Sequence, residues 1–109
     1  KVLVMGLAFK ENCPDLRNTK IVDIVNELKT HNMEVNVYDP WVNPSEAEKE
    51  YGIVLLEKLG ADYDGIILAV AHDQFKQLSI EEIRSYGKEN HIIYDLKYIY
   101  KANDTDLRL

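Results

Sequence analysis

Cysteine and basic residues are both scarce in this sequence, and each shortage excludes a class of protein. A single cysteine among 109 residues leaves no intramolecular disulfide framework and no cysteine-rich zinc site, and it suits a reducing compartment, so we expect a cytoplasmic protein. Acidic residues outnumber basic ones by 19 to 13, which gives a net charge of -6. Nucleic-acid binding depends on many lysines and arginines that neutralise phosphates, so no nucleic-acid partner is expected. A small anion needs only a local cluster of donors and is not excluded.

Long apolar segments are absent as well. No stretch approaches the roughly 20 apolar residues that span a bilayer, and the N-terminus lacks the architecture of a signal peptide, so we expect no membrane partner. The hydrophobic residues, 46% of the chain, are enough for one core and therefore for a single domain, residues 1–109. The sequence enters a core strand directly after Lys1, without an initiator methionine, and we interpret this as a fragment of a longer polypeptide.

Apolar runs with the character of buried strands recur along the chain. A nearly continuous run of this kind is typical of a strand that is buried on both faces of a parallel sheet. Residues 2–8 form such a run, and further strands are expected at 35–38, 64–72 and about 92–94. Helical patterns lie between them, and this alternation predicts an α/β fold, a three-layer Rossmann-like sandwich with a mostly parallel sheet. The polar tail, 101–109, is expected to be loosely ordered.

The segments between the strands carry helix signals. Across residues 19–30, four aliphatic side chains recur at i, i+3, i+4 and i+7, which predicts a helix capped by Asn18 or Thr19. A short acidic helix is expected over 45–51. In the segment SIEE, residues 79–82, a serine precedes a glutamate by three residues, which is the spacing of a capping box at the start of a further helix.

The segment GLAFKENCPDLRN, residues 6–18, follows the first apolar run, where a dinucleotide-binding turn would lie. A glycine-rich turn needs its second glycine for close approach of the pyrophosphate and its third for packing of the helix on the strand. Ala8 and Glu11 occupy these two places. Asp39 has the position of a ribose-binding acid, but one acid without the glycines does not indicate a cofactor site. We therefore expect no cofactor-binding residue for NAD in this domain.

The same segment carries a different set of ligand-binding features. Lys10 is a cation, Phe9 offers an aromatic face, and the positive end of a helix follows them. This combination suits a phosphorylated, partly planar ligand. Because ligands of parallel α/β sheets bind outside the carboxyl ends of the strands, the residues that end the later strands, His72, Asp95 and Lys97, are expected at the same edge.

The other reactive side chains are interpreted as structural. Asp15 and Arg17 carry opposite charges two residues apart and are expected to pair within the loop. Cys13 would need a base to act as a nucleophile, and nothing in the sequence brings His72 to it, so an inert thiol is the better interpretation. His72 is expected to form a hydrogen bond at the end of its strand. No histidine has a partner at metal-ligand spacing, so no metal site is expected.

One long segment resembles the opening of the C-terminal domain of UDP-glucose/GDP-mannose dehydrogenases, namely GLAFKENCPDLRNTKIVDIVNEL, residues 6–28. The pattern of that family is Gly-x-x-Phe-Lys, then Asp-x-Arg, then Ser or Thr at the start of a helix. Six residues fill it: Gly6, Phe9, Lys10, Asp15, Arg17 and Thr19. The segments VYDP at 37–40, AVAHDQF at 69–75 and YDLKYIY at 94–100 are similar to later blocks of the family in the same order. The resemblance therefore covers nearly the whole chain.

The resemblance implies a function that composition does not show. Members of the family oxidise the C6 hydroxyl of a nucleotide sugar to a carboxylate in two NAD-dependent steps, which supplies polysaccharide precursors, and this domain binds the UDP-sugar. NAD and the catalytic cysteine would belong to the N-terminal and central domains of the same chain, in an enzyme expected to be a homo-oligomer. The isolated domain would then hold no catalytic residue and would be inactive. The sequence of the first loop most resembles the bacterial branch of the family, which acts on UDP-N-acetylhexosamines.

The resemblance also assigns roles to individual residues. Phe9 and Lys10 match the pair that contacts the substrate, and Lys97 lies where some members have a basic residue, often arginine, directed at the nucleotide. Lysine keeps that charge but loses the bidentate geometry. Gly6, Asp15, Arg17 and Thr19 match the structural part of the motif.

An alternative remains open, a non-catalytic assembly module that uses Tyr98 and Tyr100 as its contact surface.

Overall fold

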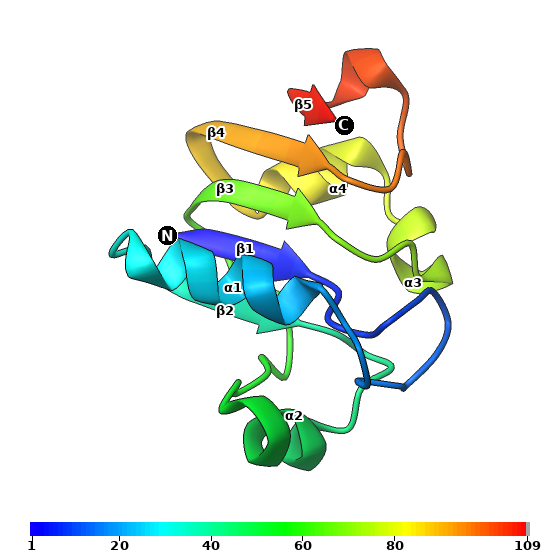
Figure 1. Ribbon diagram of the computed structural model, residues 1–109. Coiled ribbons are helices and arrows are strands. Elements are labelled where there is room, and N and C mark those ends of the chain that lie inside the picture. Colours follow the sequence, from blue (N-terminus) through cyan, green and yellow to red (C-terminus); the bar gives the residue numbers. More distant parts are fainter. Residues whose placement is uncertain (109) are drawn as a thin grey trace.

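The computed structural model describes residues 1–108, with only the backbone of Arg108, and shows a parallel sheet with helices on both faces (Figure 1). Within this range the strands are β1 (Val2–Met5), β2 (Val35–Tyr38), β3 (Tyr63–Leu68), β4 (Gly87–Asp95) and β5 (Leu107–Arg108). Their order across the sheet is β2-β1-β3-β4-β5, and each neighbouring pair is parallel. The predicted α/β sandwich with a mostly parallel sheet is confirmed.

The helices are α1 (Ile21–Thr30), α2 (Pro44–Tyr51), α3 (Asp73–Lys76) and α4 (Ile80–Ser85), with a short 3-10 turn, η1 (Ala102–Asp104). In Figure 1, α1 lies in front of the sheet and α4 lies behind it. Alternate side chains of β1 point to opposite faces. Val4 therefore packs in one core cluster with Val25 of α1, and Met5 packs in a second core cluster with Ile83 of α4. These two clusters hold the helices on the sheet.

Local hydrogen bonds explain where the helices begin. The Thr19 hydroxyl accepts from the Ile21 N–H at 3.2 Å and donates to the Leu7 carbonyl at 2.7 Å, so it ties the start of α1 to the end of β1. The prediction that Asn18 or Thr19 is the N-cap is wrong, because α1 begins at Ile21 and its N-cap is Lys20, which forms no side-chain cap hydrogen bond. The predicted capping box is confirmed, because the side chains and amides of Ser79 and Glu82 bond reciprocally. The short helix α2 starts one residue earlier than predicted, at Pro44, after an asparagine cap.

Two strands are shorter than their apolar runs predict. β1 ends at Met5 rather than residue 8, and β3 ends at Leu68 rather than residue 72. Gly6 turns the chain out of the sheet with a φ of +108°, and a Cβ at this position would lie 2.6 Å from the Cβ of Val70. Beyond these strands, Leu7, Ala8, Ala69, Val70 and His72 stay buried in the core although they leave the sheet. The apolar run therefore indicated burial correctly and strand length incorrectly.

The prediction of a loosely ordered tail is wrong for the described residues. β5 pairs with β4, and the Asp106 carboxylate accepts the Ile93 N–H at 2.8 Å. The Arg84 guanidinium donates to the Asp104 carbonyl at 2.8 Å. The Asp106 carboxylate and the Asp104 backbone carbonyl are thus used as acceptors within the fold, which composition alone does not reveal. Leu109, the last residue of the predicted tail, lies outside the described residues. Within residues 1–108, no helix is both long enough and apolar enough to span a membrane.

Candidate functional site

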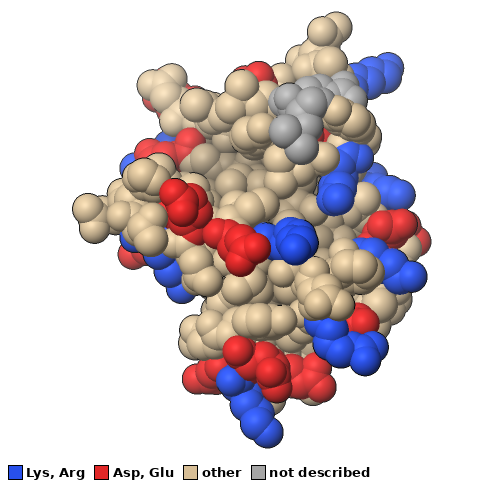
Figure 2. All heavy atoms as spheres, in the orientation of Figure 1, with Lys and Arg blue, Asp and Glu red and all other residues tan. Residues whose placement is uncertain are grey.

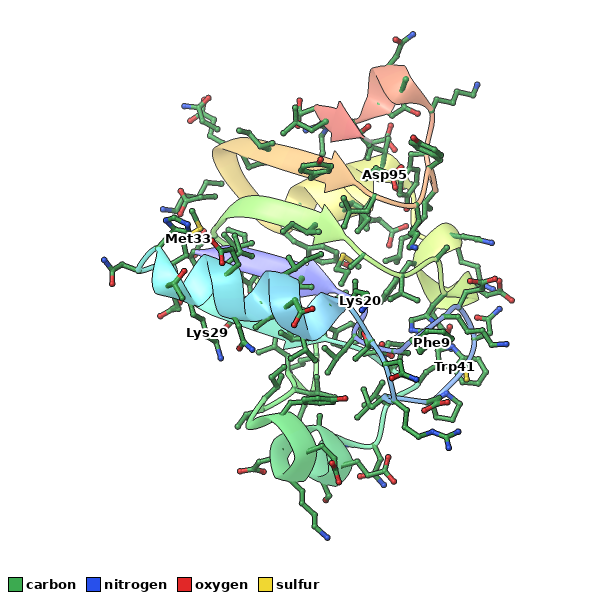
Figure 3. All side chains as sticks on the ribbon, in the orientation of Figure 1. Phe9, Lys20, Lys29, Met33, Trp41 and Asp95 are labelled. Carbon is green, nitrogen blue, oxygen red and sulfur yellow. The ribbon has the colours of Figure 1, made fainter. Side chains whose placement is uncertain are left out.

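The loops that follow β1, β3 and β4 meet around a pocket of about 150 Å³ at the carboxyl edge of the sheet. The loop after β1 contributes Phe9 and Lys10, the loop after β4 contributes Lys97, and the start of α1 contributes Lys20. Figure 3 shows Phe9 and Lys20 on this side of the molecule, with Asp95 at the end of β4. The three residues that the sequence assigns to substrate binding therefore line one pocket.

The pocket is cationic although the protein is acidic. Lys10, Lys20 and Lys97 line it, whereas Glu11 is the one acidic side chain along its described wall. Within residues 1–108, none of the three lysines forms an ion pair. Figure 2 shows several basic side chains on the right of the view, the side toward which the strand arrows of Figure 1 point. Unpaired lysines beside the positive end of α1 favour an anionic ligand.

Phe9 is the aromatic residue of this pocket, and 53% of it is exposed. Its backbone N–H donates to the Asp15 carbonyl at 2.8 Å, which joins the two ends of the loop formed by residues 9–15. The ring is therefore carried on a closed loop beside Lys10. An exposed aromatic face next to a cation can stack on the planar part of a ligand whose charged part contacts the lysine.

Asp15 and Arg17 form an ion pair within the first loop segment. The guanidinium Nε donates to Asp15 Oδ1 at 3.0 Å and Nη2 donates to Oδ2 at 3.1 Å, while the Arg17 N–H also reaches Oδ1. These hydrogen bonds from Arg17 lower the pKa of Asp15 below its usual value. The pair that the sequence predicts is present, and its role as a scaffold of the loop stays a prediction.

Asp39, at the end of β2, is a buried acceptor for the backbone of the first loop. Its Oδ2 accepts the N–H groups of Leu7 at 2.7 Å and Ala8 at 2.9 Å, and its Oδ1 accepts the Trp41 N–H at 2.8 Å. Burial alone would raise the pKa of Asp39, but the hydrogen bonds from His72, Leu7 and Ala8 outweigh it and hold the pKa below its usual value.

The surroundings of Asp39 show whether the residues of this domain fit NAD. In dinucleotide-binding folds the acid at this position reaches the ribose of the cofactor. Here Asp39 is 5% exposed, and both of its oxygens already accept hydrogen bonds from the protein. Ala8 and Glu11 replace the glycines of the turn, and the Ala8 N–H is directed at Asp39 rather than at a pyrophosphate. The residues present do not fit NAD.

His72 lies between the first loop and Asp39. Its ring is fully buried, with Nε2 3.0 Å from Asp39 Oδ2 and Nδ1 2.9 Å from the Asn12 backbone nitrogen. Both ring nitrogens are therefore engaged, and neither is directed at Cys13, which is a free thiol. Among the described residues, no group of three or more histidine, cysteine, aspartate or glutamate side chains has the arrangement of a metal site.

A second buried acid, Asp95, organises the loop that carries Lys97. Its carboxylate accepts the N–H groups of Lys97, Ile99 and Tyr100 at 3.3, 3.1 and 2.9 Å. The sequence places Asp95 at a strand end but does not reveal this role. A usable signal exists in the sequence, because Asp39 and Asp95 each come directly after a tyrosine at the end of a strand and before a turn. Aspartate at such a place often accepts from the backbone a few residues ahead.

Tyr100 is partly buried, and its hydroxyl is bonded within the protein. Its hydroxyl lies 2.9 Å from the Phe75 carbonyl and 2.5 Å from the Leu78 carbonyl, so it ties the loop after β4 to α3. Burial, with a further contribution from the charge of Asp95, raises its pKa to about 12. A raised pKa means that the neutral hydroxyl stabilises the folded state below the pKa of about 10 that the unfolded chain has, and that this contribution is lost as the pH rises through about 12.

Alkaline titration is expected to separate Tyr100 from the other tyrosines. The ultraviolet absorbance of tyrosinate should show a late step near pH 12 that belongs to Tyr100. Burial also raises the pKa of Tyr86, so the variants below are needed to assign this step. Tyr100→Phe should remove that late step. Tyr98→Phe is the matched control, because Tyr98 is 52% exposed, and it should leave the step in place. A Tyr100 that ionises together with the bulk of the tyrosines would contradict this assignment.

The fold and the pocket define a Rossmann-like domain whose carboxyl edge is suited to an anion rather than to a dinucleotide cofactor. The sequence profile of the UDP-glucose/GDP-mannose dehydrogenase family, UDP binding domain, matches residues 3–102. The chain therefore belongs to this family and corresponds to its UDP binding domain.

Individual relatives agree with the family. UDP-N-acetyl-D-glucosamine 6-dehydrogenase from Pseudomonas aeruginosa is 59% identical over 100% of this chain and 26% of the relative. The enzyme of the same name from Salmonella typhi is 50% identical over 99% of this chain and 26% of the relative. The structure of a UDP-glucose dehydrogenase from Pyrobaculum islandicum superimposes with a TM-score of 0.75 at 27% identity, over 98% of this chain and 24% of that chain. The chain thus spans about a quarter of the length of these relatives.

Proposed function

We propose that this domain binds the nucleoside diphosphate part of a UDP-sugar at the cationic pocket, within an NAD-dependent nucleotide-sugar 6-dehydrogenase. The observation that supports this function is the convergence of Lys10, Lys20 and Lys97, from separate segments, around one pocket at the start of α1. Lys10 and Lys97 contact the diphosphate, and Phe9 stacks on a planar part of the ligand. Gly6, Asp15, Arg17 and Thr19 hold the loop and the helix that carry these contacts.

The substrate we propose is a UDP-N-acetylhexosamine. Two relatives with 59% and 50% identity across this chain carry the name UDP-N-acetyl-D-glucosamine 6-dehydrogenase. Oxidation of the sugar C6 hydroxyl to a carboxylate would supply precursors for polysaccharide synthesis, in the cytoplasm. The residues that select the sugar would lie mainly in other domains, because the described pocket is only large enough for part of such a ligand.

The domain contributes binding and orientation to the reaction, not chemistry. NAD, the oxidant of the proposed reaction, would be held by an N-terminal domain of the same chain, with a central domain completing a homo-oligomer. Fixing the diphosphate in place lowers the entropy cost of bringing C6 to the reacting groups of those other domains. The isolated domain, residues 1–109, would therefore bind without catalysing.

Titration of the protein with UDP, UMP and uridine by calorimetry tests this function. Each lysine contact to a phosphate is a charge-assisted hydrogen bond worth roughly 1.5–3 kcal/mol, so UDP should bind about a hundredfold or more tightly than uridine. The affinity for UDP should also fall as salt is added. Equal binding of UDP and uridine would contradict the function. Ligand-independent dimers of the domain together with no response to UDP would favour the assembly module instead.

A further inference from the structure

The loop 9–15, which carries Phe9 and Lys10, is tied to the junction between β3 and α3 by two reciprocal hydrogen bonds. The Asn12 backbone N–H donates to His72 Nδ1 at 2.9 Å, and the Asp73 backbone N–H donates to the Asn12 side-chain oxygen at 2.9 Å. Asn12 adopts a positive φ of 54°, a conformation that asparagine tolerates better than most residues. The loop is therefore clamped at its centre as well as closed at its ends.

The hydrogen bonds of His72 define its tautomer. Because Nδ1 accepts from the Asn12 N–H, it carries no proton, so the proton of the neutral ring lies on Nε2 and is donated to Asp39 Oδ2. Asp39 Oδ2 is itself held by the N–H groups of Leu7 and Ala8. A chain of hydrogen bonds thus runs from the end of β2 through the imidazole to the centre of the loop.

Neighbouring rings hold the imidazole in place. The Trp41 ring stacks on His72 with centroids 6.1 Å apart and an angle of 30°, and Phe75 packs against it at 5.4 Å. Trp41 is fixed in turn, because its Nε1–H donates to the Gln74 side-chain oxygen at 2.8 Å. With its ring fully buried between these neighbours, His72 presents Nδ1 to the loop in one direction only.

We propose that His72 is a positioning residue for substrate binding, which sets the loop 9–15 through the Asn12 N–H so that Lys10 and Phe9 face the pocket. This role rests on the proposed function, because it assigns a purpose to the geometry of the UDP-binding loop. Lys10 is two residues from the clamped Asn12, and its long side chain contributes a fixed charge only if the backbone beneath it is fixed. A loop without the clamp must be ordered at the moment of binding, and that cost reduces affinity.

Two amide substitutions separate the two hydrogen bonds of His72. The amide of asparagine reaches the place of Nδ1, so His72→Asn keeps an acceptor for the Asn12 N–H and loses the donor to Asp39. The amide of glutamine reaches the place of Nε2, so His72→Gln keeps the donor to Asp39 and loses the acceptor for Asn12. Both variants lose one buried hydrogen bond and the imidazole ring, so each is the control for the stability loss of the other.

The test is UDP binding by the full-length protein, measured for the wild type and for each variant. His72→Gln should weaken UDP binding about tenfold, whereas His72→Asn should stay within about twofold of the wild type. In both variants kcat should change less than KM for the UDP-sugar. Hydrogen-deuterium exchange over residues 9–15 should be faster in His72→Gln and close to wild type in His72→Asn. Asn12→Gly, which keeps the positive φ and removes only the bond to Asp73, should weaken UDP binding about threefold without altering the core.

The outcomes distinguish this role from the proposed function. A wild-type protein that binds no UDP overturns the function, and the role in substrate binding with it. A wild-type protein that binds UDP, with His72→Gln and His72→Asn equal in affinity and in loop exchange, overturns the positioning role alone. If the two His72 variants do not fold, the Asn12 amide of the wild type decides, because an N–H that is bonded to His72 Nδ1 exchanges slowly with solvent. Exchange of this amide as fast as that of an exposed loop amide overturns the positioning role of His72.

Discussion

Asp39→Ala is expected to lower the free energy of unfolding of the domain by about 3–5 kcal/mol, because an unsatisfied buried polar group costs roughly 1–3 kcal/mol and several lose their acceptor together. The groups concerned are the N–H donors of Leu7, Ala8, Trp41 and the His72 ring. Water that enters the space recovers part of that cost. Urea unfolding followed by circular dichroism at neutral pH measures the change.

A matched aspartate provides the control. Asp23 is exposed in the first turn of α1, so Asp23→Ala removes the same charge without leaving buried donors. Only its interaction with the helix dipole is lost, which costs roughly 0.3–1 kcal/mol. If Asp39→Ala costs no more than Asp23→Ala, the buried carboxylate does not organise the loops as described.

The pH dependence of stability has a definite sign at this site. The pKa of Asp39 is lowered in the folded state, so its contribution is present above the unfolded value of about 3.9 and is lost as the pH falls through the folded value. The unfolding free energy of the wild type should therefore fall more steeply below about pH 4 than that of Asp39→Ala. Parallel acid limbs in the two proteins would count against the lowered pKa.

The placement of Lys10 and Lys97 at one edge of the sheet could be predicted from the sequence, because it depends only on the order of strands and helices. Alternating apolar and helical segments predict a parallel sheet, and a parallel sheet puts the carboxyl ends of its strands at one edge. Any residue that directly follows a strand is then a candidate for that edge. The reasoning holds even when strand ends are predicted inexactly. β1 ends three residues before residue 8 and β3 ends four residues before residue 72, where their apolar runs end, yet the loops that follow them still meet at this edge.

The supporting hydrogen bonds could not be predicted in the same way. Asp39 has the sequence position of a ribose-binding acid, but in the structure its partners are amides and an imidazole from other segments. The bond between Asn12 and His72 joins residues 60 positions apart and depends on a positive φ at Asn12. Such contacts depend on the exact path of two loops, and the periodicity of the sequence does not predict that path. The order of the tail could not be predicted for a similar reason. The tail is held by hydrogen bonds from Arg84 and from β4, and these contacts also depend on the path of the chain.

Lys10→Ala and Lys97→Ala are each expected to weaken UDP binding by about 10- to 100-fold, the loss that follows from one charge-assisted hydrogen bond of roughly 1.5–3 kcal/mol. The two lysines line the same pocket from different loops, so the double variant should lose about 100-fold or more. Uridine, which has no phosphate, should bind all variants alike. In the full-length enzyme that we propose, the loss should appear in kcat/KM for the UDP-sugar, with NAD affinity unchanged.

Lys29→Ala is the matched control for the lost charge. Lys29 lies in the last turn of α1, at the end opposite to Lys20 in Figure 3, and is exposed. Its removal lowers the net charge of the protein equally but leaves the pocket intact, so UDP affinity should stay within about twofold, as expected for a screened charge beyond the Debye length. Lys97→Arg should keep most of the affinity, because it restores the charge at the pocket. Variants that lose UDP and uridine binding equally would show that the lysines support the fold of the loops, not recognition of the diphosphate.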